Sequence, residues 1–273
     1  MVCLAVSGRP VQKLTEGVAS KPEAPGCFGA AKGAVPVRCH TFCHQGAARD
    51  VNPENAWRHL RGLTPLSLCD WPGRPCCVVF LGGCNLRCPT CHNASLAWDM
   101  ESEPLLPQAR LKAFLSSRAR WLSGVTVTGG EPTAVPGIGM ILHEIAASGL
   151  AIKVDTNAML PDVVEALLAE GLAQQFSVDV KGPFDQYPSL TGGAVTEAGA
   201  RRSLSRVFAL AEARPEAFLF RTTLVPQLSE TDMTTVRGML PAGFTLATQD
   251  YKPPRRPHAL ADSEARRTAG NMV

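Results

Sequence analysis

The chain has 273 residues, and 45% of them are hydrophobic, which is enough for one or two domains with a sizeable core. Lys and Arg number 27 against 24 Asp and Glu, and a formal charge of only +3 predicts neither a nucleic-acid partner nor a membrane partner. No apolar run approaches the ~18 residues of a membrane span or forms a signal-peptide core, so we expect a cytoplasmic protein with reduced cysteines.

Residues 1–60 contain several prolines and glycines without a sustained helical or strand period, which predicts an irregular extension. Cys39 and Cys43 each precede a histidine there, but their spacing matches no compact zinc or ferredoxin pattern, so we assign no role to them. We expect the folded domain to span residues 61–254, followed by a tail at 255–273.

Three cysteines lie within eight residues, directly after the apolar run 76–81: Cys84, Cys88 and Cys91. Ten cysteines in a chain of this length would produce the spacing by chance roughly 0.01 times. Zinc and iron–sulfur clusters both take thiolate ligands, but zinc needs a fourth donor, and the adjacent His92 can rarely turn back onto the same metal. A four-iron cluster on three cysteines keeps one iron open to an outside ligand, and we favour it. Zinc or unligated thiols remain alternatives.

From residue 76 onward, strand-like and helix-like segments alternate, which is typical of a parallel sheet covered by helices. The predicted strands are 76–81, 125–128, 151–155, 175–180, 217–223 and 244–248. The predicted helices are 105–116, 137–147, 161–170, 197–213 and 229–240. The span is too short for eight units of a TIM-like barrel but long enough for six. The fold class is therefore α/β, a partial, open (β/α)6 TIM-like barrel. Cys69, Cys76 and Cys77 lie in or beside strands and are predicted to be small buried side chains.

Nearly every predicted strand ends in, or is followed by, a polar or glycine-rich segment, at the end where barrels of this kind carry their chemistry. They include the cysteine loop, Gly129-Gly130-Glu131-Pro132, Asp155-Thr156-Asn157, Asp179-Val180-Lys181 and Arg221-Thr222-Thr223. We expect these segments to meet at one rim. Gln249 and Tyr251, after the last strand, receive no role beyond a wall of the site.

The Cys-x3-Cys-x2-Cys loop after a first strand resembles the cluster loop of radical S-adenosylmethionine enzymes. The segments 62–73 and 78–93 are similar to the glycyl-radical activating branch, specifically the anaerobic ribonucleoside-triphosphate reductase activating proteins. The resemblance runs from about residue 62 to residue 254. It implies an enzyme that cleaves S-adenosylmethionine reductively at a 4Fe–4S cluster and generates a glycyl radical on a partner reductase.

The resemblance also implies residue roles. Cys84, Cys88 and Cys91 would hold the cluster, and Gly129, Gly130 and Glu131 would bind the amino group of S-adenosylmethionine. Lys181 would reach its carboxylate. Asp155, Thr156 and Asp179 would lie near the sulfonium or ribose, with a monovalent cation bridging the acids, and Arg221 would contact the carboxylate or ribose. Electrons would come from a flavodoxin- or ferredoxin-type donor.

Two positions depart from the family pattern. Thr90 stands where an aromatic residue is usual, and Ala158 stands where glycine is common, so the surroundings of the adenine and the turn after Asn157 come into question. Two alternative functions also stay open. One is radical chemistry on a small molecule, as in the deazapurine-forming relatives, and the other is a zinc-stabilised, non-catalytic binding protein.

Overall fold

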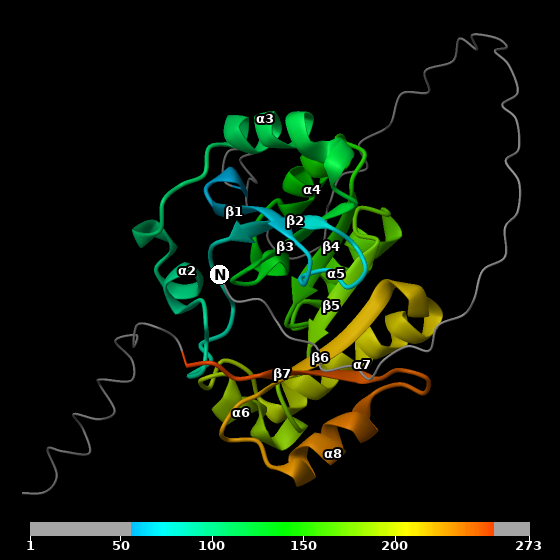
Figure 1. The fold of residues 1–273 in the computed structure, drawn as a ribbon. Coiled ribbons are helices and arrows are strands. Elements are labelled where there is room, and N and C mark those ends of the chain that lie inside the picture. The colour runs from blue at the N-terminus through cyan, green and yellow to red at the C-terminus, as the bar shows by residue number, and fades with distance from the viewer. Residues whose placement is uncertain (1–55, 254–273) are drawn as a thin grey trace, which may run out of the picture. The chain divides into compact units, whose positions relative to one another are not determined.

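The computed structural model describes residues 56–253, which form a seven-stranded sheet with the strands in sequence order. The strands are β1 (Leu60–Ser67), β2 (Cys76–Leu81), β3 (Gly124–Gly129), β4 (Ala151–Thr156), β5 (Gln175–Asp179), β6 (Phe218–Leu224) and β7 (Leu246–Asp250). β1 pairs antiparallel with β2, and each later strand pairs parallel with the one before it. The sheet is not closed, because β1 and β7 are its two ends (Figure 1).

Seven α-helices are present among the described residues: α2 (Ala94–Trp98), α3 (Gln108–Arg118), α4 (Ile138–Ala146), α5 (Pro161–Ala169), α6 (Tyr187–Leu190), α7 (Glu197–Ala213) and α8 (Glu230–Met239). Short 3-10 turns cover 100–102, 119–121, 132–134, 184–186 and 215–217. Pro161 opens α5, where its missing N–H costs nothing. Ser229 caps α8 in a reciprocal box with Asp232.

The structure confirms the predicted fold class. All six predicted strands exist within two residues of their expected bounds, and they form the open parallel sheet of six β/α units. The strand β1 was not predicted. Gly62 and Pro65 lie inside it, and its pairing with β2 is irregular at two places, as is common for an edge strand. The expected extension and tail lie outside the described residues except for residues 56–60, so the domain boundaries stay predictions.

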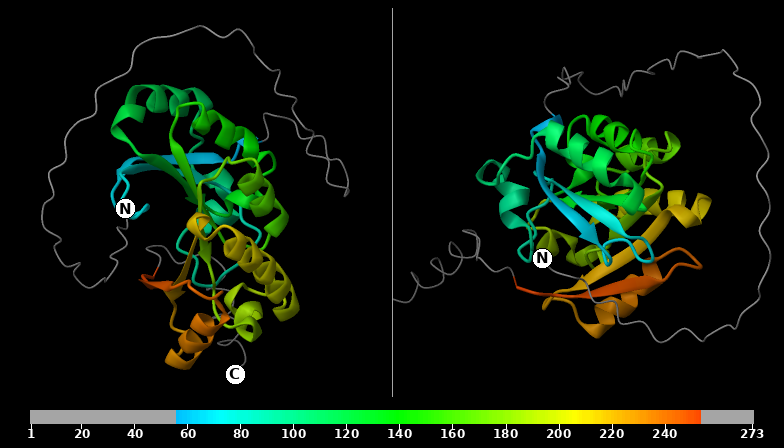
Figure 2. Two further views of the ribbon diagram at one scale, coloured as in Figure 1. Left: turned by 90° about the vertical axis from the view of Figure 1, so that its right-hand side faces the viewer. Right: turned by 45° about the horizontal axis from the view of Figure 1, so that its top comes forward.

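The two faces of the sheet differ in chemistry. Alternate side chains such as Ile152, Val154 and Val178 belong to the hydrophobic core, which the helices cover on the convex side (Figure 2). The residues between them, such as Lys153 and Asp155, therefore face the concave interior of the half-barrel. Cys76 and Cys77 are fully buried, as predicted, whereas Cys69, also predicted to be buried, is partly exposed in the turn after β1.

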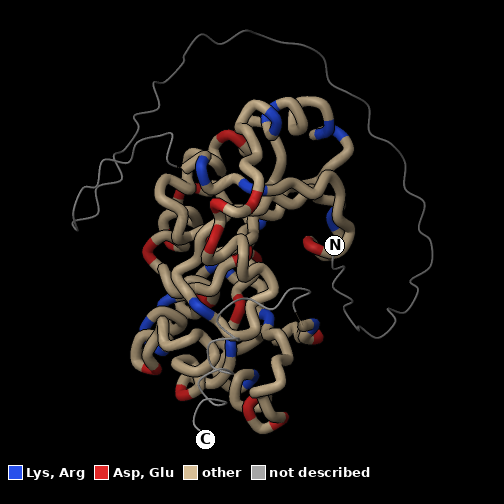
Figure 3. Tube along the Cα trace, turned by 90° about the vertical axis from the view of Figure 1, so that its left-hand side faces the viewer, with Lys and Arg blue, Asp and Glu red and all other residues tan. Residues whose placement is uncertain are grey.

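Lys and Arg are interspersed with Asp and Glu along the described chain (Figure 3). Some of them pair, as Arg206 does with Asp162 (2.6 Å) and Glu165 (2.9 Å). Among residues 56–253, no helix is both long and apolar enough to cross a bilayer.

Candidate functional site

The cysteine loop follows β2 and is tied through its backbone to two separate parts of the chain. The N–H of Gly83 donates to Leu96 O (2.9 Å), and the N–H of Arg87 donates to Thr191 O (3.2 Å). The Arg87 side chain donates to the carbonyls of Cys84 and Leu86, at 2.9 Å each. The loop is therefore fixed from both sides before any ligand binds.

The three thiols of this loop are free and partly buried. Burial raises the pKa of Cys84 to about 12, although the Leu86 N–H donates to its sulfur at 3.3 Å, and burial also raises the pKa of Cys88 and Cys91. Thiolates here need a metal to supply compensating positive charge. No three His, Cys, Asp or Glu side chains of the described part converge tightly enough to hold a single metal ion. A zinc site requires such convergence, whereas in a four-iron cluster each thiolate binds its own iron.

Gly129 and Gly130 bring the end of β3 against the end of β2. A Cβ on Gly130 would lie 2.0 Å from Gly83 O, and one on Gly129 would lie 2.3 Å from Leu81 O. The N–H of Glu131 donates to the same Gly83 carbonyl at 2.8 Å. The two glycines are thus needed for packing against the cysteine loop, and their predicted contact with a ligand remains a prediction.

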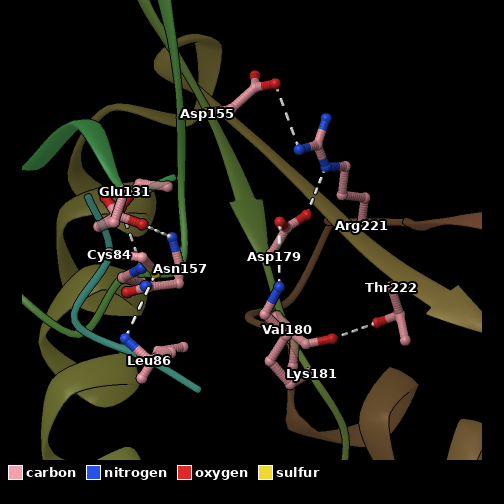
Figure 4. Close-up of polar contacts among 12 residues, drawn as sticks. Cys84, Leu86, Glu131, Asp155, Asn157, Asp179, Val180, Lys181, Arg221 and Thr222 are labelled. Carbon is pink, nitrogen blue, oxygen red and sulfur yellow. Dashed lines mark hydrogen bonds and ion pairs between the residues drawn. The ribbon is translucent and has the colours of Figure 1, made fainter. Parts of the chain in front are cut away.

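Glu131 is turned inward and is 1% exposed. Its carboxylate accepts from Thr133 N and Oγ1 (3.1 and 2.6 Å), Thr156 Oγ1 (2.7 Å) and Asn157 N (2.7 Å), as Figure 4 shows for Asn157. Burial raises the pKa of this carboxyl, and the four donors counteract that effect. Glu131 and Thr156 therefore join the ends of β3 and β4. The contacts of these two residues with S-adenosylmethionine stay predictions.

Asn157 connects this junction to the cysteine loop, since its Nδ2 donates to Asn85 Oδ1 at 2.7 Å. The next residue, Ala158, is fully buried and adopts φ 63°, a left-handed conformation that favours glycine. Ala158, which stands where glycine is common in the family, therefore keeps the backbone turn that glycine would make, but with left-handed strain.

Four of the predicted site residues, together with Lys153, form one alternating chain of charges on β4, on β6, and on β5 and the residues just after it. Figure 4 shows its members Asp155, Arg221, Asp179 and Lys181. Lys153 pairs with Asp155 Oδ1, and Arg221 bonds to Asp155 Oδ2 (3.3 Å) and Asp179 Oδ1 (2.5 Å). Asp179 Oδ2 accepts from Lys181 Nζ at 3.3 Å. We call this set of five residues the ion-pair chain.

The outer end of the ion-pair chain lies near the thiols. Burial opposes the charged form of Lys181, but Asp179 and the sulfurs of Cys88 and Cys91 outweigh it and raise the pKa of the ammonium. Burial of Asp179 is likewise outweighed by Arg221 and Lys181, which hold its pKa well below the usual range. Arg221 bridges the two acids. The monovalent cation expected near them stays a prediction.

The C-terminal end of the described chain also reaches the cysteine loop. The His92 ring contacts the Lys252 backbone through Nε2 and stacks on Tyr251, with ring centroids 5.4 Å apart. Asn93 Nδ2 donates to Gly129 O at 3.1 Å. His92 is thus directed toward residues 251–252, in agreement with its exclusion as a ligand of the same metal.

The segment 62–73, which contributed to the family resemblance, begins beside the end of β2, where Gly62 pairs with Phe80, and its last residues, 70–73, lie at the opposite end of the sheet from the cysteine loop. Trp71 is 4% exposed and packs against Gly124 at the start of β3, where a Cβ would lie 2.5 Å from its ring. Ser67 at the same end pairs with Cys76, the first residue of β2. The residues at this end stabilise the fold and do not line the site.

Sequence reasoning gave no role to four contributors to the site: Asn93, Asn157, Lys153 and the turn at Thr191-Gly192. Each acts through a partner at least two residues away, and most of these partners are far apart in the sequence. Only Asn157 stood inside a segment already singled out at a strand end.

The cysteine loop and its surroundings fit a 4Fe–4S cluster with one iron open to an outside ligand. The donors are three soft thiols on a loop whose backbone is fixed, with an N–H aimed at one sulfur and the Lys181 ammonium beside two of them. Cationic donors at a strand-end rim also suit a carboxylate-bearing ligand.

Comparison with known proteins identifies the family. The Radical SAM superfamily profile matches residues 78–237. The chain is 26% identical over 196 residues to the “Putative glycyl-radical enzyme activating enzyme” of Methanocaldococcus jannaschii, a match that covers 71% of this chain and 80% of that protein.

Two shorter matches have other names. The 7-carboxy-7-deazaguanine synthase of Rhodospirillum rubrum is 36% identical over 103 residues, 37% of this chain and 39% of that protein. The pyruvate formate-lyase-activating enzyme of Staphylococcus epidermidis is 30% identical over 106 residues, 37% of this chain and 41% of that protein.

Because the superfamily profile spans more than half of the chain, this protein belongs to the radical SAM superfamily, whose enzymes use a 4Fe–4S cluster and S-adenosylmethionine.

Proposed function

We propose that this protein is an activating enzyme for a glycyl-radical enzyme, and that its target is an anaerobic ribonucleoside-triphosphate reductase. The observation that carries the proposal is the extent of similarity. The match to the M. jannaschii protein covers 71% of this chain, whereas the match to the R. rubrum synthase covers 37%. The choice of reductase rests on the resemblance of segments 62–73 and 78–93.

In this proposal Cys84, Cys88 and Cys91 hold the cluster. When bound and reduced, the cluster supplies the electron that cleaves S-adenosylmethionine and so provides a radical able to remove a hydrogen atom. Lys181 and Arg221, at the exposed part of the ion-pair chain, bind the ligand's carboxylate. Gly129 and Gly130 offer backbone to its amino group, and Glu131 holds that backbone in place.

The remaining rim residues orient the rest of the ligand. Asp155 and Asp179 lie on the ligand side of β4 and β5, where their charge would attract the sulfonium or bond the ribose hydroxyls. Thr156 holds Glu131 and acts on the ligand indirectly. Lys153, Arg221 and Lys181 together carry more charge than the two acids, so the charge balance of Asp155 and Asp179 does not by itself call for the monovalent cation.

The open sheet suits a protein substrate. β1 and β7 each have one neighbouring strand within the described residues, so the half-barrel is not closed by pairing between them. A glycine-bearing loop of the partner could enter from that side, with Tyr251 and His92 near the cluster loop. A flavodoxin- or ferredoxin-type protein would deliver the electron.

The test is anaerobic reconstitution with the reductase of the same organism. We expect about four irons per chain, release of 5′-deoxyadenosine on reduction, and a glycyl radical signal on the reductase by electron paramagnetic resonance. Cys88→Ala should lose all three, whereas Cys69→Ser, at the opposite end of the sheet, should keep them. Release of deoxyadenosine without a radical on the reductase would refute the activating role and leave the radical chemistry standing.

A second candidate is radical chemistry on a small molecule, favoured by the 36% identity to the R. rubrum synthase. It predicts that deoxyadenosine release accelerates with a small-molecule precursor of a deazapurine and not with a glycyl-radical enzyme. The zinc-binding alternative predicts zinc without iron, and the superfamily match does not favour it.

A further inference from the structure

Lys153 is a buried cation that the proposed chemistry does not use. It lies on β4 between two residues of the hydrophobic core, so its side chain enters the concave interior, and it is 1% exposed. Its ammonium pairs with Asp155 Oδ1. Burying a charged pair costs several kcal/mol per ion unless the geometry compensates it, by the order-of-magnitude figures for proteins. A buried lysine at this place therefore calls for a physical reason.

The ion-pair chain becomes steadily more exposed from Lys153 outward. The side-chain exposures are 1% for Lys153, 9% for Asp155, 17% for Arg221, 25% for Asp179 and 30% for Lys181. The buried end is closed to any ligand, and the outer end is open. A ligand that responds to the charge of the chain must therefore bind at the Arg221 and Lys181 end.

The chain holds three cations and two carboxylates, which leaves one positive charge in excess among the five groups. Lys153 takes one oxygen of Asp155 and Arg221 takes the other. Without Lys153, Arg221 would be the remaining cationic partner of Asp155. The charges of the four remaining groups, two cations and two carboxylates, would then sum to zero. Nearby Glu131 is held by hydroxyl and amide donors and has no cationic partner in its bonds.

Arg221 and Lys181 also have donors to spare. A guanidinium has five N–H groups, and those of Arg221 serve two carboxylates through Nε and Nη2. Lys181 has three N–H groups and, among residues 56–253, one side-chain hydrogen-bond partner, Asp179. The excess charge and the spare donors thus occur at the same exposed end.

We propose that Lys153 is a positioning residue: by neutralising Asp155 from inside the half-barrel, it leaves Arg221 and Lys181 with one positive charge more than Asp179 balances, which is available to the carboxylate of S-adenosylmethionine. The inference rests on the proposed assignment of those two residues to the carboxylate. It is independent of which substrate receives the radical.

The test compares affinity for S-adenosylmethionine with affinity for decarboxylated S-adenosylmethionine, measured by equilibrium dialysis on the reconstituted, oxidised enzyme. The wild type prefers the carboxylate-bearing ligand, and in Lys153→Met we expect this preference to fall about tenfold, the change for weakening one charge-assisted hydrogen bond. Lys153→Arg should restore it. Lys112→Met, which removes a surface lysine on α3, should leave both affinities unchanged.

A double variant separates charge from packing. Lys153→Met with Asp155→Asn removes one charge of each sign from the buried end and keeps the excess positive charge, so the preference for the carboxylate should return. It also avoids a buried carboxylate with a missing partner, which keeps the test usable if Lys153→Met folds poorly. Equal loss of affinity for both ligands, or no loss for either, would overturn the proposal. Failure of radical transfer to the reductase would refute the activating role and would not affect this result.

Discussion

The cysteine loop and the ion-pair chain meet at the same rim but are held in different ways. The loop is fixed by backbone hydrogen bonds and by close approach to glycines, as at Gly130 and Gly192. The ion-pair chain is fixed by side-chain charges on β4, β5 and β6. Backbone anchoring leaves the thiol side chains free for a metal, whereas pairing of charges leaves donors for an anionic ligand. Mutations in the ion-pair chain should therefore lower stability without loss of iron binding, whereas mutations at the anchors of the cysteine loop should lower iron binding.

The largest expected effect concerns the middle of the ion-pair chain. Arg221→Met leaves Asp155 and Asp179 without their shared partner, and removal of one member of a buried pair costs about 3–5 kcal/mol. Denaturant unfolding of the variant should show a loss of this size, while the cysteine loop still takes up iron. Arg206→Met, at an exposed pair, should cost no more than about 1 kcal/mol. Equal costs for the two variants would refute the importance of burial.

The next effect concerns the anchor of the loop. A Cβ on Gly192 would lie 2.2 Å from Arg87 O, and Gly192 has φ 64°. Gly192→Ala should displace the loop, cost about 2–4 kcal/mol from backbone strain and overpacking, and reduce iron bound after reconstitution.

The neighbouring glycine is the matched control. Gly193 has φ 77° with nothing within 4 Å of its Cβ position, so Gly193→Ala should cost about 1–2 kcal/mol and leave iron uptake intact. The same iron content in both variants would show that contact with Arg87 does not position the loop.

A smaller effect is expected with pH. The pKa of Asp179 is lowered on folding by Arg221 and Lys181, so its contribution to stability is present above its unfolded pKa and is lost as the pH falls below about 4. Stability of the iron-free chain should decline less steeply over this range in Asp179→Asn than in the wild type. If the unfolding free energies of the two proteins fell equally steeply with decreasing pH, the ion pairing of Asp179 would be contradicted.

The smallest effect is expected at Ala158. Glycine would relieve about 1–2 kcal/mol of left-handed strain, but it would lose a buried methyl worth about 0.8 kcal/mol and add chain entropy. Ala158→Gly should therefore change the unfolding free energy by less than about 1 kcal/mol. A larger loss would show that the methyl group packs against the site in a way that the strain does not offset.

The same comparison explains what the sequence could predict. The cysteine loop is local: its three ligands lie within eight residues, and their spacing alone indicates a cluster. The parallel strands are likewise local apolar runs, so five of the six predicted strands start or end within one residue of the observed bounds.

The ion-pair chain and the loop anchors depend on tertiary contacts. Asp155, Asp179 and Arg221 were singled out because they follow or end strands, but nothing in the sequence indicates that Arg221 bridges both acids or that Lys153 closes the inner end. Gly192 contacts Arg87 across about a hundred residues. Gly129 and Gly130, at the end of β3, were expected to face a ligand. In the structure they lie against the backbone of Leu81 and Gly83, because the ends of parallel strands lie close together at this rim.

The most direct test of the account is electron paramagnetic resonance of the reduced, reconstituted protein with and without S-adenosylmethionine. We predict a 4Fe–4S signal that changes when the ligand is added, since one iron has no protein thiolate, and that is absent in Cys88→Ala. A cluster signal that is identical with and without S-adenosylmethionine, or that survives in Cys88→Ala, would contradict the assignment of Cys84, Cys88 and Cys91 as the three ligands of an open cluster.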